Sequence, residues 1–190
     1  MKSVIGGTST RQVAFVGPFG VGKTTAVCTV SEGSVATTDV ASTAMLMRGG
    51  RHLKSTTTVG LEVGQWLAPD GTSVHVVGTP GQERFDVVRK SAMPRSQGVV
   101  LWLFGQHEQA VLDTQLWLEF IAAEVPTRKL TVALTRHEES TIPLTEFRST
   151  IDAVDPSIPL VLADPREHED VVRVLMASLR VPDASAREVG

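Results

Sequence analysis

Short apolar runs rich in β-branched residues alternate with longer segments of helical periodicity along most of the chain. This alternation is typical of a mainly parallel sheet covered by helices. The runs predicted to be strands span residues 12–16, 59–67, 73–77, 99–104, 130–134 and 160–163. Pro69-Asp70-Gly71 joins the second run to the third and favours an antiparallel hairpin at this one place. The pattern therefore predicts an α/β fold with a six-stranded, mostly parallel sheet.

About five helices are expected, beginning near Lys23, Asp86, Glu108, Leu144 and Arg166. Two of them have clear apolar faces, which we expect to lie in the core. These faces comprise Val111, Leu112, Leu116 and Phe120 in the third helix, and Val171, Val172, Leu175 and Leu179 in the fifth. Further core positions are predicted for three tryptophans and the single cysteine, namely Trp66, Trp102, Trp117 and Cys28.

Residues 32–57 follow neither period and are rich in Ser, Thr and Gly. We predict that this segment is irregular, as functional loops often are. The chain of 190 residues is 42% apolar and 21% charged, an ordinary balance for one globular domain. We expect that domain to span residues 11–181, with short flexible termini at 1–10 and 182–190.

Charge and cysteine content limit the classes of partner. The formal net charge of −3 argues against broad electrostatic binding to nucleic acid. A single cysteine provides no disulfide framework, so a cytoplasmic location is expected. The terminal residues lack the patterns of a signal peptide and of lipidation, and we therefore expect no direct membrane anchor. The scattered histidines do not have the spacing of a zinc site.

The strongest chemical motif follows the first predicted strand. Gly17-Pro18-Phe19-Gly20-Val21-Gly22-Lys23-Thr24 matches the pattern G-x-x-x-x-G-K-[ST] and leads into a helix. Glycines let backbone N–H groups surround phosphate oxygens, and the helix presents its positive end to them. Lys23 would contact the β- and γ-phosphates, and the Thr24 hydroxyl would bind Mg²⁺. The sequence therefore predicts a nucleoside triphosphate site at residues 17–25.

A second motif extends from Gly78-Thr79-Pro80-Gly81-Gln82 to Glu83-Arg84-Phe85, and Thr58 precedes it at the start of the predicted hairpin. These residues resemble the switch regions of Ras/Rab-like small GTPases. The Gly-Thr-Pro-Gly-Gln variant is similar to bacterial small GTPases of the gliding-motility and conservon kinds. The resemblance extends over about residues 11–180 and implies a three-layer, P-loop GTPase-like fold of the TRAFAC-like kind.

The resemblance also implies roles for individual residues. Thr58 would contact Mg²⁺ and the γ-phosphate, Gly81 would donate its backbone N–H to the γ-phosphate, and Gln82 would orient the attacking water. Gln82, Lys23 and Thr58 are thus the expected catalytic residues, and Thr24 and Thr58 the expected metal ligands. The implied cofactors are Mg²⁺ and GTP or GDP. Switch segments at about 33–58 and 78–92 would signal to a protein regulator or effector, for which the resemblance suggests a Roadblock-type protein.

Two departures from the family pattern concern the phosphate end. Gly78 replaces the aspartate that normally holds Mg²⁺ through water, so weaker Mg²⁺ binding is expected. Asp39 or Glu62 could substitute, but the sequence alone does not choose between them. Phe19 replaces a common glycine, and we expect it to crowd the γ-phosphate and slow hydrolysis. Arg48, Arg51 or Arg84 could supply an arginine in cis, although solvated surface charges are favoured.

The third departure is at the base-binding motif, where the family's Asn-Lys-x-Asp becomes Thr135-Arg136-His137-Glu138. A carboxylate can accept hydrogen bonds from the N1–H and amine of guanine, so Glu138 favours guanine over adenine. Arg136 can stack on the base. The residues expected to bind nucleotide are Gly17, Phe19, Gly20, Val21, Gly22, Lys23, Thr24, Thr25 and Gly81 at the phosphate end, and Thr135, Arg136, Glu138, Ala163 and Asp164 at the base end.

The leading hypothesis is a GTP-binding switch with slow, Mg²⁺-dependent GTP hydrolysis. The departures at Gly78, Phe19 and Thr135 leave open a nucleotide-binding scaffold with little or no turnover, or an ATP-binding P-loop protein. A P-loop kinase is a third alternative. Such kinases usually carry an arginine-rich lid, which the distribution of arginines here does not suggest.

Overall fold

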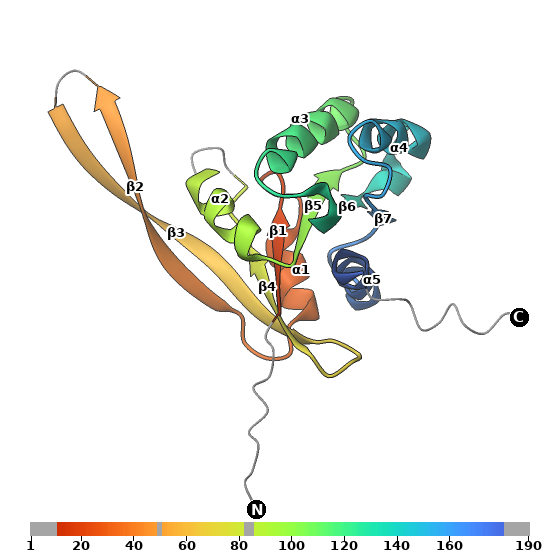
Figure 1. The fold of residues 1–190 in the computed structure, drawn as a ribbon, viewed down its shortest axis with the longest axis horizontal. Helices are drawn as coiled ribbons and strands as arrows, with labels where there is room; N and C mark the ends of the chain where they lie inside the picture. Colours follow the sequence, from red (N-terminus) through yellow and green to blue (C-terminus); the bar gives the residue numbers. More distant parts are fainter. Residues whose placement is uncertain (1–10, 49–50, 82–85, 181–190) are drawn as a thin grey trace, which may run out of the picture.

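The backbone fold was analysed in a computed structural model, which describes residues 11–48, 51–81 and 86–180; for residues 38–48, 51–59 and 86–88 it describes the backbone alone. Over these residues, seven strands form one sheet in the order β2-β3-β4-β1-β5-β6-β7 (Figure 1). The strands are β1 (Arg11–Val16), β2 (Ala36–Arg48), β3 (Arg51–Leu67), β4 (Ser73–Gly78), β5 (Gly98–Phe104), β6 (Leu130–Thr135) and β7 (Leu160–Leu162). All pairs from β4 to β7 are parallel, which confirms the mostly parallel α/β sheet.

The six-stranded prediction was wrong because it omitted β2. Residues 32–57 were predicted to be irregular, whereas β2 and the first part of β3 pair there as antiparallel strands. Many of these residues are threonines, whose β-branched side chains favour extended backbone. Polar residues on both faces erase the apolar–polar alternation by which a half-buried strand is predicted. The β2–β3 ribbon projects from the body of the domain (Figure 1).

The β3–β4 hairpin forms where the sequence predicted it. The Ala68 N–H donates to the Thr72 carbonyl oxygen over 2.9 Å, and the Gly71 N–H to the Ala68 carbonyl over 2.8 Å. Gly71 has a φ of 78°, a left-handed conformation that glycine adopts without steric penalty. This tight turn fixes the antiparallel register between β3 and β4, in which Leu67 lies opposite Ser73.

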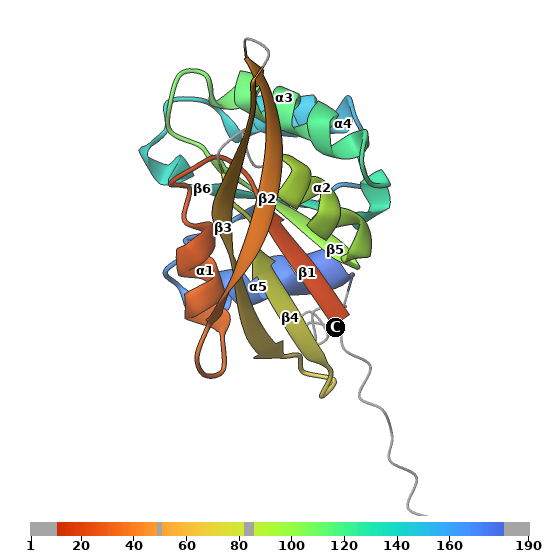
Figure 2. The same ribbon diagram turned by 90° about the vertical axis from the view of Figure 1, so that its left-hand side faces the viewer.

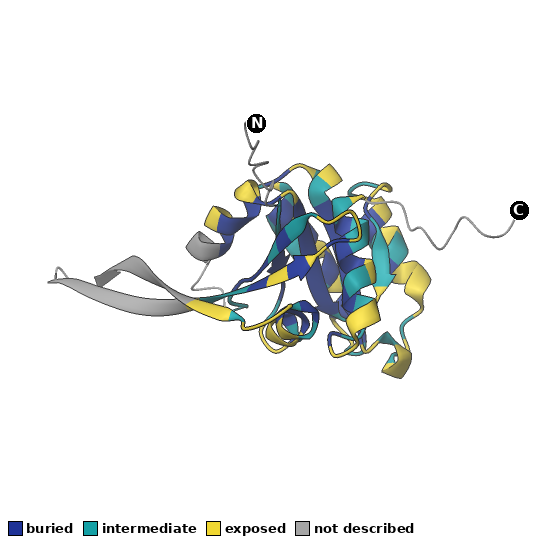
Figure 3. Ribbon diagram, turned by 90° about the horizontal axis from the view of Figure 1, so that it is seen from below, coloured by how far each residue is buried: buried dark blue, intermediate teal, exposed yellow. Residues whose placement is uncertain are grey.

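Helices cover both faces of the sheet and give a three-layer structure (Figures 1 and 2). In the described part of the chain they are α1 (Lys23–Val30), α2 (Asp86–Arg95), α3 (Ala110–Ala122), α4 (Leu144–Asp152) and α5 (His168–Leu179). Helices α1 and α5 bury Val27 and Leu175 in one core cluster with β1. On the opposite face, Met93, Leu118 and Ile151 of α2, α3 and α4 belong to a second cluster with β5 and β6. Figure 3 shows the central strands buried between these layers.

The predicted core face of α3 was partly wrong. Leu112 and Leu116 are 52% and 54% exposed, while Ala110, Thr114, Leu118 and Ile121 are buried. Residues two apart on an α-helix differ by about 200° in direction, so the face containing Thr114 and Leu118 turns Leu112 and Leu116 outward. The prediction for α5 is confirmed, since Val171 and Leu175 are buried and Val172 and Leu179 pack against them.

Three smaller observations complete the fold. The Cys28 thiol is exposed, which contradicts its predicted burial, because α1 buries Ala26, Val27 and Val30 on its other side. Trp66 and Trp102 are buried and Trp117 is partly buried against the second cluster, as predicted. No helix within the described ranges combines the length and the apolar character needed to cross a membrane.

Candidate functional site

The loop that follows β1 leads directly into α1 and carries three glycines with positive φ, namely Gly17 (134°), Gly20 (79°) and Gly22 (105°). A Cβ on Gly17 would lie 2.1 Å from the Trp102 carbonyl oxygen, and one on Gly22 would lie 2.5 Å from Pro165 Cγ. Both the conformation and the space at these two positions therefore require glycine. The predicted strand–loop–helix arrangement is present.

Lys23 lies at the first position of α1 and turns back into this loop. Its Nζ donates to the Gly17 carbonyl oxygen over 2.8 Å and to the Pro18 carbonyl oxygen over 2.7 Å. Burial lowers the pKa of Lys23 from 10.5 to about 8; the positive charge of Arg89 lowers it further, and the negative charge of Glu62 opposes both effects. At neutral pH the loop therefore holds a buried, largely protonated ammonium group, which favours a nearby anion.

A pocket of about 370 Å³ opens beside this ammonium group. Three segments line it: the loop and the start of α1, strand β3, and the turn after β4. The lining residues are Phe19, Gly20, Gly22, Lys23, Thr24, Thr25, Gly60, Glu62, Gly78, Thr79, Pro80 and Gly81. The volume is within the range of ordinary small-ligand sites.

The turn after β4 packs directly on the loop that follows β1. The buried Thr79 donates to the Phe15 carbonyl oxygen from its backbone N over 3.0 Å and from its hydroxyl over 2.9 Å. A Cβ on Gly81 would lie 2.4 Å from Phe19 N and 2.6 Å from Phe19 Cα. The backbone at Gly81 thus lies so close to Phe19 that only glycine fits there. This contact brings together two segments that were predicted to form the site.

Phe19 occupies the rim of the pocket. Although it lines the pocket, 73% of its surface is exposed. Its expected crowding of a γ-phosphate, and slow hydrolysis as the result, stays a prediction. Val21 is buried in the first core cluster, so any contact of this residue with a ligand would come from its backbone.

Thr24 and Glu62 bring two oxygen donors to the same side of the pocket. Thr24 Oγ1 donates to Glu62 Oε1 over 2.8 Å. Hydroxyl and carboxylate oxygens are ligands that Mg²⁺ prefers, so these residues fit a magnesium ion held together with phosphate oxygens and water. Sequence reasoning left the choice between Asp39 and Glu62 open. The predicted hairpin turn could have decided it. Glu62 and Gly78 lie equally far on either side of Asp70, so a hairpin centred there pairs Glu62 with the position from which the aspartate is absent.

The side chains of two predicted catalytic residues, Thr58 and Gln82, are not among those that the structure describes. Thr58 lies in β3 opposite Ala41, and only its backbone is described. Gln82 lies outside the described residues, as does Arg84. Arg48 and Arg51 lie opposite each other in the β2–β3 ribbon, again with backbone positions only. The predicted roles of these residues stay predictions.

The predicted base-binding residues lie beyond the pocket lining. Thr135 is buried at the end of β6, and its carbonyl oxygen accepts from the Gly105 N–H over 2.8 Å. The exposed Arg136 has a φ of 55°, and its guanidinium lies 5.7 Å from the centroid of the Phe104 ring. Glu138 is exposed in a short 3₁₀ helix, His137–Glu139. Arg136 and Glu138 are thus both exposed after the end of β6.

Asp164 follows the buried Ala163 after β7 and forms an ion pair with Arg166. Hydrogen bonds from Arg166 lower the pKa of this carboxyl group, and the charge of Arg136 also lowers it. The lowered pKa keeps the Asp164 carboxyl group ionised at neutral pH, and its role in base binding stays a prediction. Pro165, the next residue, lies so close to Gly22 that a Cβ there would meet its ring, so this loop packs against the loop that follows β1.

Within residues 11–48, 51–81 and 86–180, no group of three or more His, Cys, Asp or Glu side chains is placed to hold a metal ion. A magnesium site here would therefore combine protein oxygens with those of a ligand and water. Comparison of the chain with models of protein families and with curated proteins finds no match.

Proposed function

We propose that this chain is a GTP-binding molecular switch with a P-loop GTPase-like fold, which hydrolyses GTP slowly in the presence of Mg²⁺. The observation that carries the proposal is the buried ammonium of Lys23, held by the Gly17 and Pro18 carbonyl oxygens beside a pocket. A desolvated cation at the start of a helix, within a glycine-rich turn, is complementary to phosphate groups. The motif at residues 17–24 supports the same assignment.

In the proposed reaction, the backbone N–H groups of the loop hold the phosphates and Lys23 neutralises charge on the β- and γ-phosphates. Gly81 donates its N–H to the γ-phosphate, and Gln82 orients water for attack on the γ-phosphorus. The bond to the β–γ bridging oxygen then breaks and yields GDP and inorganic phosphate. When bound, Mg²⁺ would neutralise charge on the phosphate oxygens. Thr24 and Thr58 offer hydroxyl oxygens to it.

For the base, the proposal assigns Glu138 as the acceptor from guanine N1–H and the exocyclic amine, with Arg136 stacked on the ring. Thr135, Ala163 and Asp164 complete this end of the site. The switch segments at about 33–58 and 78–92 would change with the γ-phosphate and present a surface to a protein regulator or effector. The resemblance of the switch motif points to a Roadblock-type protein for this role.

Binding of a fluorescent GDP derivative tests the first step. Lys23→Ala is expected to weaken the affinity by about 10- to 100-fold, because a charge-assisted contact is lost. Lys129→Ala is the matched control, since Lys129 Nζ also donates to two carbonyl oxygens, of Pro94 and Ser96, away from the pocket. Equal affinities of the two variants would reject the phosphate-loop assignment. Displacement by GDP but not ADP is expected, and a preference for ADP would reject guanine recognition.

The second candidate is a nucleotide-binding scaffold with little turnover. It is favoured by Gly78, which places no carboxylate of its own at the pocket, and by Phe19 at the rim. Phosphate release in a single turnover separates the two candidates. A switch GTPase releases phosphate faster than its Gln82→Leu variant, whereas a scaffold releases it equally slowly in both proteins.

A further inference from the structure

Glu62 and Gly78 are cross-strand partners in the β3–β4 hairpin. Gly78 is the last residue of β4 and is buried, and Glu62 is partly buried. Residues directly opposite each other in an antiparallel pair lie on the same side of the sheet. A side chain at position 78 and the side chain of Glu62 would therefore enter the same space.

Distances confirm that the carboxylate of Glu62 fills this space. A Cβ on Gly78 would lie 3.0 Å from Glu62 Oε2 and 3.5 Å from Glu62 Cβ. The other carboxylate oxygen, Oε1, accepts the hydrogen bond from Thr24 Oγ1. Both Glu62 and Gly78 line the pocket next to Lys23. The carboxylate missing from β4 is thus present on the neighbouring strand.

We propose that Glu62 is the residue that positions the divalent cation of this site and makes nucleotide binding conditional on that cation. The inference rests on the proposed nucleotide binding and deepens it. By accepting the hydrogen bond from the Thr24 hydroxyl, Glu62 orients the lone pairs of that hydroxyl oxygen toward the pocket. Its carboxylate can also accept a hydrogen bond from a cation-bound water, as outer ligands of metal sites do.

The dependence of nucleotide binding on the cation follows from electrostatics. Glu62 lines the same pocket in which the phosphates would bind, so its negative charge repels them when no cation lies between. A divalent cation held at Thr24 turns this repulsion into attraction to both groups. A purely structural acceptor for the Thr24 hydroxyl would have no such effect. The two roles therefore differ in how affinity depends on Mg²⁺.

The test is the affinity of the full chain for a fluorescent GDP derivative, measured with saturating Mg²⁺ and with excess EDTA. Glu62→Gln keeps the size of the side chain and an oxygen that can accept from Thr24. We expect this variant to bind several-fold more tightly than wild type in EDTA, and its gain in affinity from Mg²⁺ to be smaller by about 10- to 100-fold. Glu119→Gln, the same change on α3, is the control and should behave as wild type.

A second variant moves the carboxylate instead of removing it. Glu62→Ala combined with Gly78→Asp places the acid on β4, in the space that Glu62 vacates. Gly78 has no positive φ, so its backbone conformation is open to aspartate, and the new Cβ would lie 3.3 Å from Val27 Cγ2, a methyl group that must shift slightly. We expect this double variant to regain most of the Mg²⁺ dependence that Glu62→Ala loses.

The outcomes separate the inference from the proposed function. If wild type binds the GDP derivative more tightly with Mg²⁺ and Glu62→Gln shows the same Mg²⁺ dependence, the role of Glu62 is rejected while nucleotide binding stands. If wild type binds without any effect of Mg²⁺, the inference is likewise rejected. A wild-type chain that does not bind the derivative under either condition rejects both proposals.

Discussion

Arg89 Nη1 donates a hydrogen bond to the Pro80 carbonyl oxygen over 2.7 Å, which ties helix α2 to the turn after β4. The guanidinium is also 5.1 Å from the ring centroid of Trp117 and 5.8 Å from that of Phe120, both on α3. Because Arg89 is only 2% exposed, these contacts are made out of water, where they are stronger than on the surface. The turn that covers the loop after β1 is therefore connected through one side chain to two helices.

Replacement of this arginine is expected to destabilise the protein. Arg89→Ala leaves the Pro80 carbonyl without this donor and opens a cavity beside Trp117, which should lower the free energy of unfolding by roughly 2–4 kcal/mol. Urea denaturation measures the change. Arg95→Ala, at the exposed end of the same helix, should lie within about 0.5 kcal/mol of wild type. Equal stability of the two variants would contradict a connecting role for Arg89.

The pKa of Lys23 predicts how nucleotide affinity depends on pH. Since the pKa is lowered to about 8, Lys23 loses its proton as the pH rises through 8 in the free protein. Binding of an anion favours the protonated form, so affinity for GDP should fall progressively above about pH 8. Fluorescence titration across this range measures the fall. Lys23→Ala should lack this pH dependence, and a wild-type affinity that stays constant up to pH 10 would contradict the prediction.

Gly81 is expected to tolerate no side chain. The Cβ introduced by Gly81→Ala would meet backbone atoms of Phe19, so either the loop that contains Phe19 or the turn after β4 must move. If Gly81 donates to the γ-phosphate, this movement should lower the preference for a non-hydrolysable GTP analogue over GDP by about tenfold. Competition binding with the two nucleotides gives the ratio. An unchanged ratio would place the contact to the γ-phosphate elsewhere.

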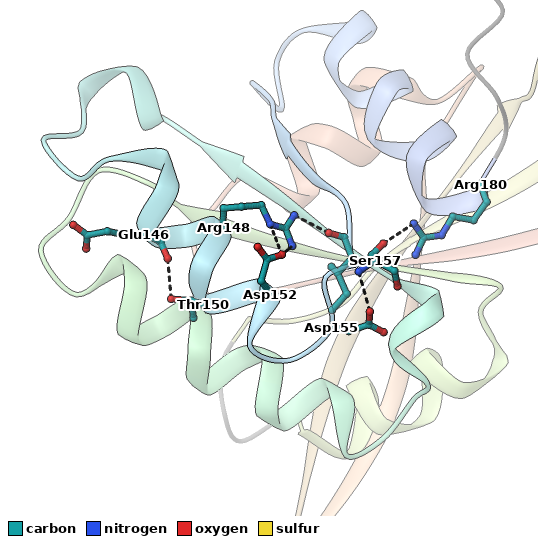
Figure 4. Close-up of polar contacts among 8 residues, drawn as sticks. Glu146, Arg148, Thr150, Asp152, Asp155, Ser157 and Arg180 are labelled. Atoms are coloured by element: carbon teal, nitrogen blue, oxygen red, sulfur yellow. Dashed lines mark hydrogen bonds and ion pairs between the residues drawn. The ribbon is translucent and has the colours of Figure 1, made fainter.

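Asp155 is expected to make stability depend on acid pH. Its carboxylate accepts hydrogen bonds from the Thr127 hydroxyl and from the Ser157 backbone N–H, the latter visible in Figure 4. The bond from Thr127, followed by those from Ser157, lowers the pKa of Asp155 from 3.8 to about 2. Because the folded pKa is the lower one, the stabilisation is complete above about pH 4 and is lost as the pH falls towards 2.

The measurement for Asp155 is the melting temperature of wild type and of Asp155→Asn between pH 2 and pH 6. Wild type should melt at the higher temperature at pH 6, and the difference should shrink below about pH 4. A difference that stays the same across this range would show that the carboxylate charge has no part in stability.

The conformation of the loop that follows β1 could be predicted in detail because its determinants are local. Gly17, Gly20 and Gly22 adopt the positive φ values that a tight turn before α1 requires, and Lys23 begins the helix as expected. The parallel strands β1, β5 and β6 were equally easy to predict from the sequence. They are buried on both faces and therefore consist mainly of continuous apolar runs.

The features that escaped prediction depend on contacts distant in sequence. The exposure of Leu112 and Leu116 follows from which face of α3 meets the sheet, and periodicity alone does not choose between overlapping apolar faces. Likewise, strand β2 depends on pairing with β3, since its own residues show no alternation. The contact of Glu62 with Thr24 required the register of the hairpin as well as the position of α1.

The contact between Gly22 and Pro165 has a consequence for the energetics of recognition. The two loops that it joins are far apart in sequence, yet at this point they lie so close that a Cβ on Gly22 would meet Pro165. A ligand that spans both loops would meet a surface already assembled, so little conformational entropy is lost on binding. Once one end of such a ligand is bound, the other end is held at a high effective concentration next to its own loop.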